Sequence, residues 1–261
     1  AYKDQGLEIV GIHTPEFAFE KDIQNVRDAA RKFGLKFPLV LDNDYATWNA
    51  WGNRYWPRKY LIDINGNVVY DHIGEGAYDE TEAKIIELLN ERKRVLGEAG
   101  TVVDTMGVPK NAVTVDFGKI KTPETYLGSS RIQYLVNLPA QSCLSGSCAY
   151  SFTDGLPRGY ELSGQWKIDG EYAMLENGEG AIRIAFEANK VNLVAGSDLP
   201  VRAEIYVDGV MHREVVIKEH GLYNLVDLGD DYENHIMEIR FFDAGVSAFA
   251  FTVAATFTTS G

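Results

Sequence analysis

Apolar and polar positions in the first 97 residues alternate between strand-like and helix-like patterns. The runs LEIVGIH (7–13) and FPLVLD (37–42) are typical of buried strands, because their apolar residues are almost continuous over a strand-like length. Between these runs, four apolar residues recur at helical spacing: Ile23, Val26, Ala30 and Phe33. Gly34 then suits the position just after a helix. This pattern predicts the strand–helix alternation of an α/β domain.

The next segments continue this alternation. DYATWNAWGN (44–53) predicts a short helix that begins at Asp44 and stops at Gly52. KYLIDINGNVVYDHIG (59–74) predicts a β-hairpin, because an Asn-Gly pair between two apolar runs favours a tight turn. DETEAKIIELLNERKRVL (79–96) has the apolar stripe of an amphipathic helix.

The pattern changes in the second half of the chain. From about residue 125 onward the sequence shows short runs with a period of two, separated by turn residues such as VDGV and FDAGV. Such runs predict an antiparallel β-sandwich or jelly roll. The residues between the two patterns contain scattered Gly and Pro without a sustained period. We therefore expect an α/β domain at 1–97, a linker at 98–124 and an all-β sandwich at 125–261.

Composition and charge narrow the classes of partner. The formal net charge of −13 disfavours nucleic acid, whose phosphates would be repelled. No apolar run is long enough to span a bilayer, and we expect no signal peptide in this sequence. We recognise no nucleotide-binding or metal-binding motif and expect neither a cofactor nor a metal, with calcium on the acidic sandwich as the open alternative.

Two cysteines, Cys143 and Cys148, lie in the stretch QSCLSGSCAYS. Their spacing is not that of a CxxC redox motif or of a metal pair. A small structural disulfide is the interpretation we favour, and it would indicate an oxidising compartment. Two free thiols and a redox-active pair remain as alternatives.

The stretch NRYWPRKYLIDINGNVVYD places Trp56 and Pro57 directly before a predicted strand. Proline lacks the N–H that a sheet ladder needs, so it is tolerated at the start of a strand. The residues alone allow either an ordinary trans entry to the strand or a cis turn that presents backbone groups to another molecule.

The same stretch resembles the part of TlpA-like extracytoplasmic thioredoxin-fold proteins that carries a cis-proline. The longer run from AYKDQGLEIVGIHTPEF through FPLVLDNDYATWNAWGN to YDHIGEGAYDETE resembles DipZ-type proteins. These join a membrane electron-transfer domain to a thioredoxin domain and to a β-sandwich like a carbohydrate-binding module. LSGQWKIDGEYAML, LYNLVDL and HIMEIRFFDAGVSAFAFTV are similar to that C-terminal domain.

The resemblance implies a thiol–disulfide oxidoreductase that needs no cofactor. Trp56 and Pro57 would face the family's dithiol and the substrate, and Glu16 would lie near them. The implied partners are protein thiols and disulfides, a membrane electron-transfer domain and a cell-surface glycan. The implied location is extracytoplasmic, at the periplasm or cell surface, with a membrane tether in the full-length protein.

One departure from the family is central. The CxxC motif is expected upstream of Ala1, so this chain contains no catalytic cysteine of that kind. The first strand and the CxxC helix of the thioredoxin fold are also absent from it. We expect a gap in the sheet between Leu7–His13 and Tyr60–Ile64, filled by the missing N-terminal segment or by another chain.

Two other classes of function remain open. The chain could be a glycan-binding module whose thioredoxin-like part is only a scaffold, or an interaction protein whose open slot accepts a partner's strand. We expect His13 to be a structural histidine. We expect Trp166, which lies among apolar neighbours in GQWKI, to belong to the core of the sandwich and not to a sugar-binding surface.

Overall fold

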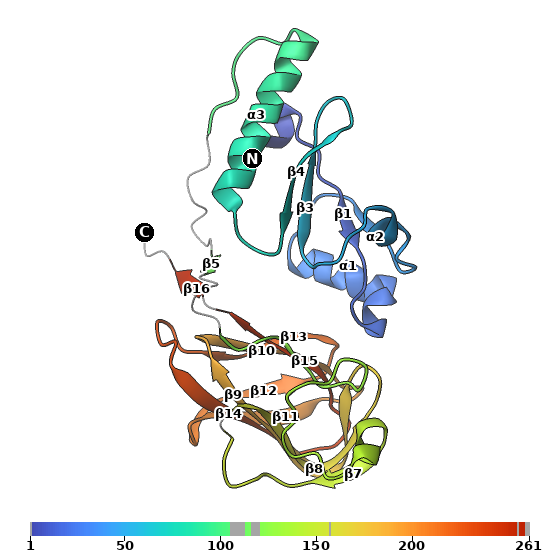
Figure 1. The fold of residues 1–261 in the computed structure, drawn as a ribbon, viewed down its shortest axis with the longest axis vertical. Coiled ribbons are helices and arrows are strands. Elements are labelled where there is room, and N and C mark those ends of the chain that lie inside the picture. Colours follow the sequence, from blue (N-terminus) through green and yellow to red (C-terminus); the bar gives the residue numbers. More distant parts are fainter. Residues whose placement is uncertain (1, 105–112, 116–120, 157, 255, 259–261) are drawn as a thin grey trace. The chain divides into compact units, whose positions relative to one another are not determined.

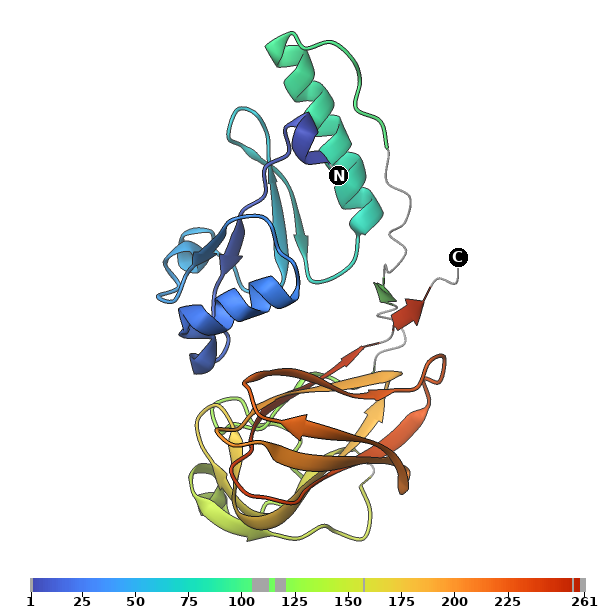
Figure 2. The same cartoon turned by 180° about the vertical axis from the view of Figure 1, so that it is seen from behind.

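The structure is a computed structural model that describes residues 2–104, 113–115, 121–156, 158–254 and 256–258. Contacts along the chain divide it into two compact units, shown from two sides in Figures 1 and 2. Unit 1 comprises Ala1–Ala112 with Thr259–Gly261, and unit 2 comprises Val113–Thr258. The segment predicted as a linker is therefore shared between them, and part of it lies outside the described residues, as does the end of the predicted sandwich.

Unit 1 alternates strands and helices in the order that the sequence predicts. Its strands are β1 (Gly11–His13), β2 (Leu39–Leu41), β3 (Arg58–Ile62) and β4 (Val68–Ile73). Its helices are α1 (Ile23–Lys32), α2 (Ala46–Ala50) and α3 (Tyr78–Leu96), with 3₁₀ turns at Tyr2–Gln5 and Ala18–Lys21. Gly34 and Gly52 follow α1 and α2 with φ angles of 64° and 57°, so both helices end at the predicted glycines.

The four strands of unit 1 form two separate sheets. β1 pairs in parallel with β2, placing Ile12 opposite Val40, and β3 pairs antiparallel with β4 around the predicted hairpin. Within the described residues, β1 and β3 are not hydrogen-bonded to each other or through a shared neighbour. The separation expected between Leu7–His13 and Tyr60–Ile64 is therefore present, and the identity of the segment that fills it stays a prediction.

The predicted burial of the first strand is wrong. Val10 is 58% exposed and Ile12 is 45% exposed, and Phe33 at the end of α1 is 69% exposed. The buried apolar cluster of unit 1 is small and consists of Tyr2, Leu89 and Val102, around α3. An apolar strand is buried only where other elements cover its faces, and the two-stranded sheets of this unit lack that cover.

Unit 2 is an all-β structure, as the sequence predicts. Its strands are β5 (Val113–Val115), β6 (Thr125–Tyr126), β7 (Ser147–Tyr150), β8 (Gly159–Ile168), β9 (Ala173–Glu187), β10 (Lys190–Gly196), β11 (Val201–Val207), β12 (Val210–Ile217), β13 (Gly221–Asp227), β14 (Asn234–Phe241), β15 (Ser247–Ala254) and β16 (Thr256–Thr258). A 3₁₀ turn at Gln141–Ser145 precedes β7. β5 and β16 form a small antiparallel pair of their own.

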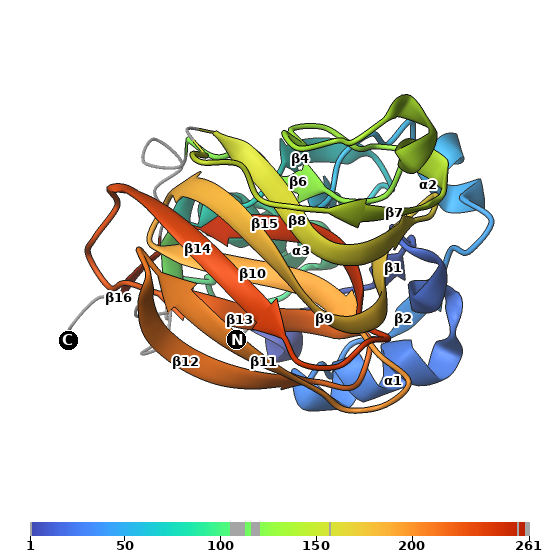
Figure 3. The same cartoon turned by 90° about the horizontal axis from the view of Figure 1, so that it is seen from below.

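The long strand β9 joins two layers of the sandwich, which Figure 3 shows from below. Ala173 pairs with β15, which continues to β10 and β13, whereas the end of β9 pairs with β14, which continues to β11 and β12. β8 runs beside β9 and carries β7 on its other edge. The apolar core lies between the layers, and Trp166 at its centre is fully buried, which confirms the prediction for this residue.

Candidate functional site

Trp56 and Pro57 lie at the entry to β3 and are joined by a cis peptide bond, so the cis interpretation is confirmed. Pro57 contributes its carbonyl oxygen to the hairpin, accepting a hydrogen bond of 2.8 Å from the amide of Gly74. Its missing N–H is not needed there because the strand starts only at Arg58. The Trp56 side chain is 46% exposed and thus forms part of the surface of unit 1.

Two contacts hold the indole of Trp56 in place. Its Nε1 donates a hydrogen bond of 3.1 Å to the backbone oxygen of Thr14, just after β1. Its ring packs on Trp48 of α2, with 4.2 Å between the ring centroids. Trp56 thereby connects three segments that are far apart in the sequence. Because these contacts fix the orientation of the indole, its exposed part would meet another molecule in one orientation.

Asp42, at the end of β2, organises the contacts behind Trp56. Its carboxylate accepts hydrogen bonds of 2.8 Å from the amides of Thr47 and Trp48 and one of 3.1 Å from the Thr14 hydroxyl. Burial alone would raise the pKa of Asp42, but these hydrogen bonds to the carboxylate have the larger effect. The pKa of Asp42 therefore lies below its ordinary value. The prediction that Asp44 caps α2 is wrong, since the buried carboxylate of Asp42 takes the free amides.

Glu20 holds the loop that carries Glu16. The Glu20 carboxylate accepts a hydrogen bond of 2.7 Å from the Glu16 amide, and its pKa is raised by burial, against the lowering effect of that bond. Nε2 of His13 lies 3.0 Å from the Glu20 backbone oxygen, which fits the structural role expected for this histidine. Tyr45 donates its hydroxyl to the backbone oxygen of Pro15 in the same loop. Glu16 therefore lies two residues after Thr14, whose backbone oxygen accepts the hydrogen bond from Trp56.

The site offers an aromatic wall and hydrogen-bonded backbone, but both cysteines of the described residues lie in unit 2, where they form a disulfide. The sequence analysis named Trp56, Pro57 and Glu16, whose substrate-facing role stays a prediction, but it did not name the supporting residues Thr14, Asp42 and Trp48. An aspartate directly after the apolar run FPLVL was an available signal for a cap of the next helix. In the part of the chain that the structure describes, no group of acidic, histidine or cysteine side chains could hold a metal.

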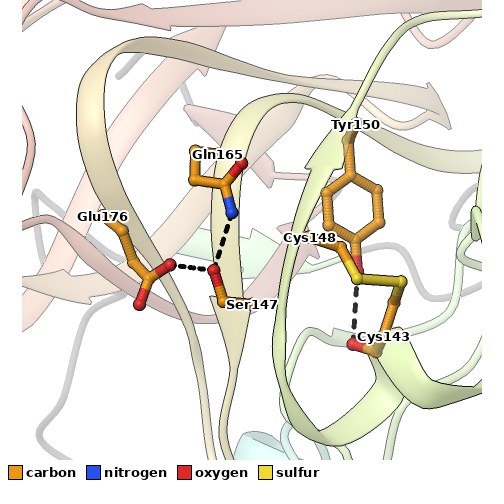
Figure 4. Close-up of a disulfide and its surroundings, with 6 residues drawn as sticks. All are labelled: Cys143, Ser147, Cys148, Tyr150, Gln165 and Glu176. Carbon is orange, nitrogen blue, oxygen red and sulfur yellow. Dashed lines mark hydrogen bonds between the residues drawn. A yellow bond between two sulfur atoms is a disulfide. The ribbon is translucent and has the colours of Figure 1, made fainter.

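Cys143 and Cys148 form a disulfide in unit 2, which confirms the structural interpretation over free thiols. Figure 4 shows it beside the ring of Tyr150, whose hydroxyl donates a hydrogen bond of 3.3 Å to the backbone oxygen of Cys143. Cys143 is buried, and Cys148 lies in β7 opposite Trp166 of β8. The disulfide thus fastens the 3₁₀ turn before β7 to the apolar core.

Ser147 points to a separate polar cluster beside the disulfide (Figure 4). Its hydroxyl donates to Glu176 and accepts a hydrogen bond of 2.7 Å from Nε2 of Gln165. No histidine takes part in these contacts, and the base beside the serine is the Glu176 carboxylate, which is a weak one. We interpret it as a structural link between β7, β8 and β9.

Known proteins resemble this chain over both units. The chain is 36% identical over 200 residues to Protein DipZ of Mycobacterium bovis, and this match covers 75% of the chain and 27% of DipZ. The chain thus spans about a quarter of the length of these curated relatives. It is 35% identical over 81 residues to the thiol-disulfide oxidoreductase ResA of Bacillus anthracis, covering 31% of the chain and 44% of ResA.

Solved structures resemble the chain only weakly. A two-domain esterase active on acetylated mannans is 13% identical with a TM-score of 0.34, covering 97% of this chain and 63% of the esterase. Similarity at this level supports no conclusion about the chain. No helix in the described ranges is long and apolar enough to cross a membrane.

A family model described as "Thioredoxin like C-terminal domain" matches residues 122–253. These residues coincide with the β-sandwich and not with the α/β unit that carries Trp56. The matched segment makes up half of the sequence. The chain therefore belongs to the thioredoxin-like C-terminal domain family.

Proposed function

We propose that unit 1 is the substrate-facing part of an extracytoplasmic thiol–disulfide oxidoreductase of the thioredoxin type. In this proposal the unit is completed by a strand and a CxxC helix that this chain lacks. The same chain carries a β-sandwich as a binding module. The similarity to DipZ and ResA supports the redox class. The separation of unit 1 into two small sheets supports the proposal that a further strand completes it.

The observation that carries the proposal is the open construction of unit 1. β1 and β3 belong to different sheets, and both sheets expose apolar side chains, including Val10, Ile12 and Ile62. Unit 2, in contrast, buries a large continuous core. A strand inserted between β1 and β3 would pair with free backbone groups and cover these side chains. Such a strand would also bring its following helix into unit 1.

The completed unit would carry out thiol–disulfide exchange. A thiolate of the supplied dithiol would attack one sulfur of a partner's disulfide, releasing the partner's other sulfur as a thiolate and forming a mixed disulfide. The second cysteine would then attack the mixed disulfide, which leaves the partner reduced and the enzyme oxidised. Trp56 and Pro57 would hold the partner's backbone beside the reacting sulfurs, and Glu16 would border the same surface.

The test uses a chain extended upstream through the dithiol segment. Insulin reduction in the presence of dithiothreitol should proceed faster with the extended chain than with dithiothreitol alone. The chain of 261 residues serves as the control and should add nothing to the dithiothreitol rate. An extended chain without activity above the control would refute the redox proposal, whatever the sandwich does.

The location and the electron source follow from the same proposal. The disulfide between Cys143 and Cys148 supports an oxidising, extracytoplasmic compartment. We propose a membrane electron-transfer domain, in the same or a neighbouring protein, as the donor that restores the dithiol, and a membrane tether in the full-length protein. Reduction of the oxidised extended chain by membranes from the source cells, followed by thiol alkylation, tests this step.

A second candidate function is that of a glycan-binding module with unit 1 as a scaffold. The favouring observation is a polar face of unit 2 on which arginines stack on aromatic rings, as between Arg240 and Tyr206.

A third possibility, that the gap in unit 1 binds another protein's strand, is tested separately. A peptide with the sequence of the missing strand should bind this chain and dissolve any association between copies.

A further inference from the structure

The outer face of one layer of unit 2 carries alternating carboxylates and guanidinium groups. Glu161 of β8 lies opposite Arg183 of β9, which in turn lies opposite Glu238 of β14. The next register position pairs Arg240 of β14 with Glu204 of β11. These strands are hydrogen-bonded neighbours, seen together in Figure 3. Their charges therefore form rows across the sheet, at the spacing of adjacent strands.

Side chains along a strand point alternately to its two sides, and this alternation separates the charged face from the core. On β11, Arg202, Glu204 and Tyr206 alternate with Ala203 and Ile205, which are fully buried. The same alternation holds on β14, where Glu238 and Arg240 alternate with buried apolar residues. The charged side chains of these two strands thus project to the side of the layer that faces away from the core.

Aromatic rings lie under the guanidinium groups of this face. Three arginine carbons each lie 4.1 Å from the centroid of an aromatic ring, in the pairs Arg183–Phe152, Arg202–Phe242 and Arg240–Tyr206. Stacking fixes the plane of each guanidinium group while its N–H groups remain at the rim of the plane. The arginines are therefore ordered and still able to donate hydrogen bonds sideways and outward.

Two of the three stacked arginines, Arg183 and Arg202, are only loosely paired within the protein, whereas Nε of Arg240 donates a hydrogen bond of 2.6 Å to Glu238. The pairs of Arg183 with Glu161 and Glu238 measure 3.8 and 3.4 Å, and those of Arg202 with Glu204 and Glu214 measure 3.5 and 3.7 Å. Charge-assisted hydrogen bonds are ordinarily about 2.7–2.9 Å. Oε2 of Glu161, whose side chain is fully buried, has no hydrogen-bond partner among the described residues.

We propose that this face, formed by β8, β9, β14 and β11, is the ligand-binding surface of the sandwich and that its ligand is a neutral saccharide. A sugar hydroxyl donates to a carboxylate and accepts from a guanidinium group at the same time, so it matches the alternation. An acidic polymer would meet Glu204 and Glu238, and a basic one would meet the arginines, whereas Glu161 is buried and would not touch the ligand. This inference rests on the proposed role of the sandwich as a glycan-binding module.

The experiment titrates the full chain with three probes: cellohexaose, the hexamer of N-acetylglucosamine and hexagalacturonate. Amide NMR shifts report the binding site, and calorimetry reports affinity. We expect at least one neutral hexasaccharide to bind, with shifts confined to β8, β9, β11 and β14. Hexagalacturonate should bind at least tenfold more weakly. Tighter binding of the acidic probe would overturn the assignment of a neutral ligand.

Variants locate the surface. Arg240→Ala removes a side chain that is 48% exposed, and Tyr206→Phe removes only the hydroxyl that donates to Glu204. Each should weaken binding of the neutral probe, with a loss of about tenfold or more for Arg240→Ala. Lys190→Ala is the matched control. Like Arg240→Ala it removes one ion pair, here the pair of Lys190 with Asp227 at 3.0 Å, but Lys190 lies in the other layer. It should change the affinity less than twofold.

The outcomes separate this inference from the function on which it rests. Binding that persists in both variants, or shifts that map to loops or to unit 1, would refute the surface but leave a glycan-binding module. Absence of binding by every probe at millimolar concentration would refute the module itself. Unchanged melting temperatures of the variants ensure that a lost affinity reflects the surface and not unfolding.

Discussion

Trp48 and Trp56 pack with their ring centroids 4.2 Å apart, and both are tied to the loop after β1. Trp56 reaches the loop through its hydrogen bond to Thr14, and Trp48 reaches it through the Asp42 carboxylate, which binds the Trp48 amide and the Thr14 hydroxyl. These contacts form a closed circuit, that is, a ring of interactions that runs from Trp56 through Thr14, Asp42 and Trp48 and back to Trp56. The orientation of Trp56 therefore depends on Trp48 and on the buried residues Thr14 and Asp42.

Trp48→Leu should lower the activity of the dithiol-extended chain without unfolding it. Loss of the aromatic pair removes about 1 kcal/mol of orienting interaction, which corresponds to roughly five- to tenfold in kcat/KM for insulin reduction. Trp51→Leu is the matched control, since Trp51 packs on Tyr60, with 4.9 Å between the ring centroids, and takes no part in the circuit. Equal losses in both variants would show that the stacking on Trp56 has no specific role.

Asp42→Asn should make unit 1 less stable above pH 4 and less sensitive to acid. The folded-state pKa of Asp42 is lowered, so its contribution to stability is present above the unfolded pKa of about 3.9 and is lost as pH falls through the folded value. Weaker bonds to two amides and a hydroxyl should cost about 1–3 kcal/mol at neutral pH. Hydrogen exchange at the amides of Thr47 and Trp48, followed from pH 3 to 6, measures both effects. An unchanged acid dependence would contradict the assignment.

Local patterns predicted the elements of unit 1 but not their burial. Helical spacing and the glycines after α1 and α2 depend on neighbouring residues only, so Gly34 and Gly52 were found from the sequence. Burial of Val10 and Ile12 depends on neighbours in the sheet, which local periodicity does not contain. Asp42 was missed for a similar reason, because its carboxylate reaches amides five and six residues ahead across a left-handed Tyr45.

In unit 2 the alternation of apolar residues predicted both the strands and the core position of Trp166. The alternation could also have marked the outward residues of β11 and β14. It could not show that Arg183 stacks on Phe152 or that Glu161 is buried, because both depend on how the chain before β8 folds over the sheet. The disulfide was predicted because only two cysteines, five residues apart in sequence, are present.

Replacing Cys143 and Cys148 together with serine should destabilise unit 2 by about 2 kcal/mol. The disulfide closes a short loop, and the chain-entropy estimate for a loop of this length gives that magnitude. Urea unfolding monitored by the fluorescence of Trp166, which lies opposite Cys148, provides the measurement. Ser147→Ala, which alters the neighbouring polar cluster, is the control. A double variant as stable as the oxidised protein would contradict a stabilising role.

Gly128→Ala should destabilise unit 2 through a backbone clash. A Cβ at Gly128 would lie 2.2 Å from the carbonyl carbon of Glu171 and 2.5 Å from the amide nitrogen of Tyr172, which cannot move aside as a side chain can. We expect a loss of about 1–3 kcal/mol in the free energy of unfolding. Gly221→Ala should change it little, because no atom lies within 4 Å of the added Cβ. Similar effects of the two variants in urea unfolding would argue against close packing at Gly128.

His235 should make the stability of unit 2 fall as the pH rises above neutrality. Its Nδ1 lies 2.7 Å from Asp208 and its Nε2 lies 3.2 Å from Asp231. Burial lowers the pKa of His235, but the two aspartates raise it more, so the folded pKa lies above the ordinary value. The contribution of the charged histidine is therefore complete below about pH 6.5 and is lost as the pH rises through the folded value.

The two aspartates have the opposite dependence. The pKa of Asp231 is lowered by hydrogen bonds from the Glu233 amide and from His235. Burial raises the pKa of Asp208, but hydrogen bonds from His235 and the Ile236 amide lower it more. Both contributions are therefore lost as the pH falls toward 4 and below. Unit 2 should thus be most stable between these limits. In His235→Gln, the fall in the free energy of unfolding between pH 6 and 9 should shrink, as measured by urea unfolding at each pH. The same alkaline fall in the variant would assign it to other groups.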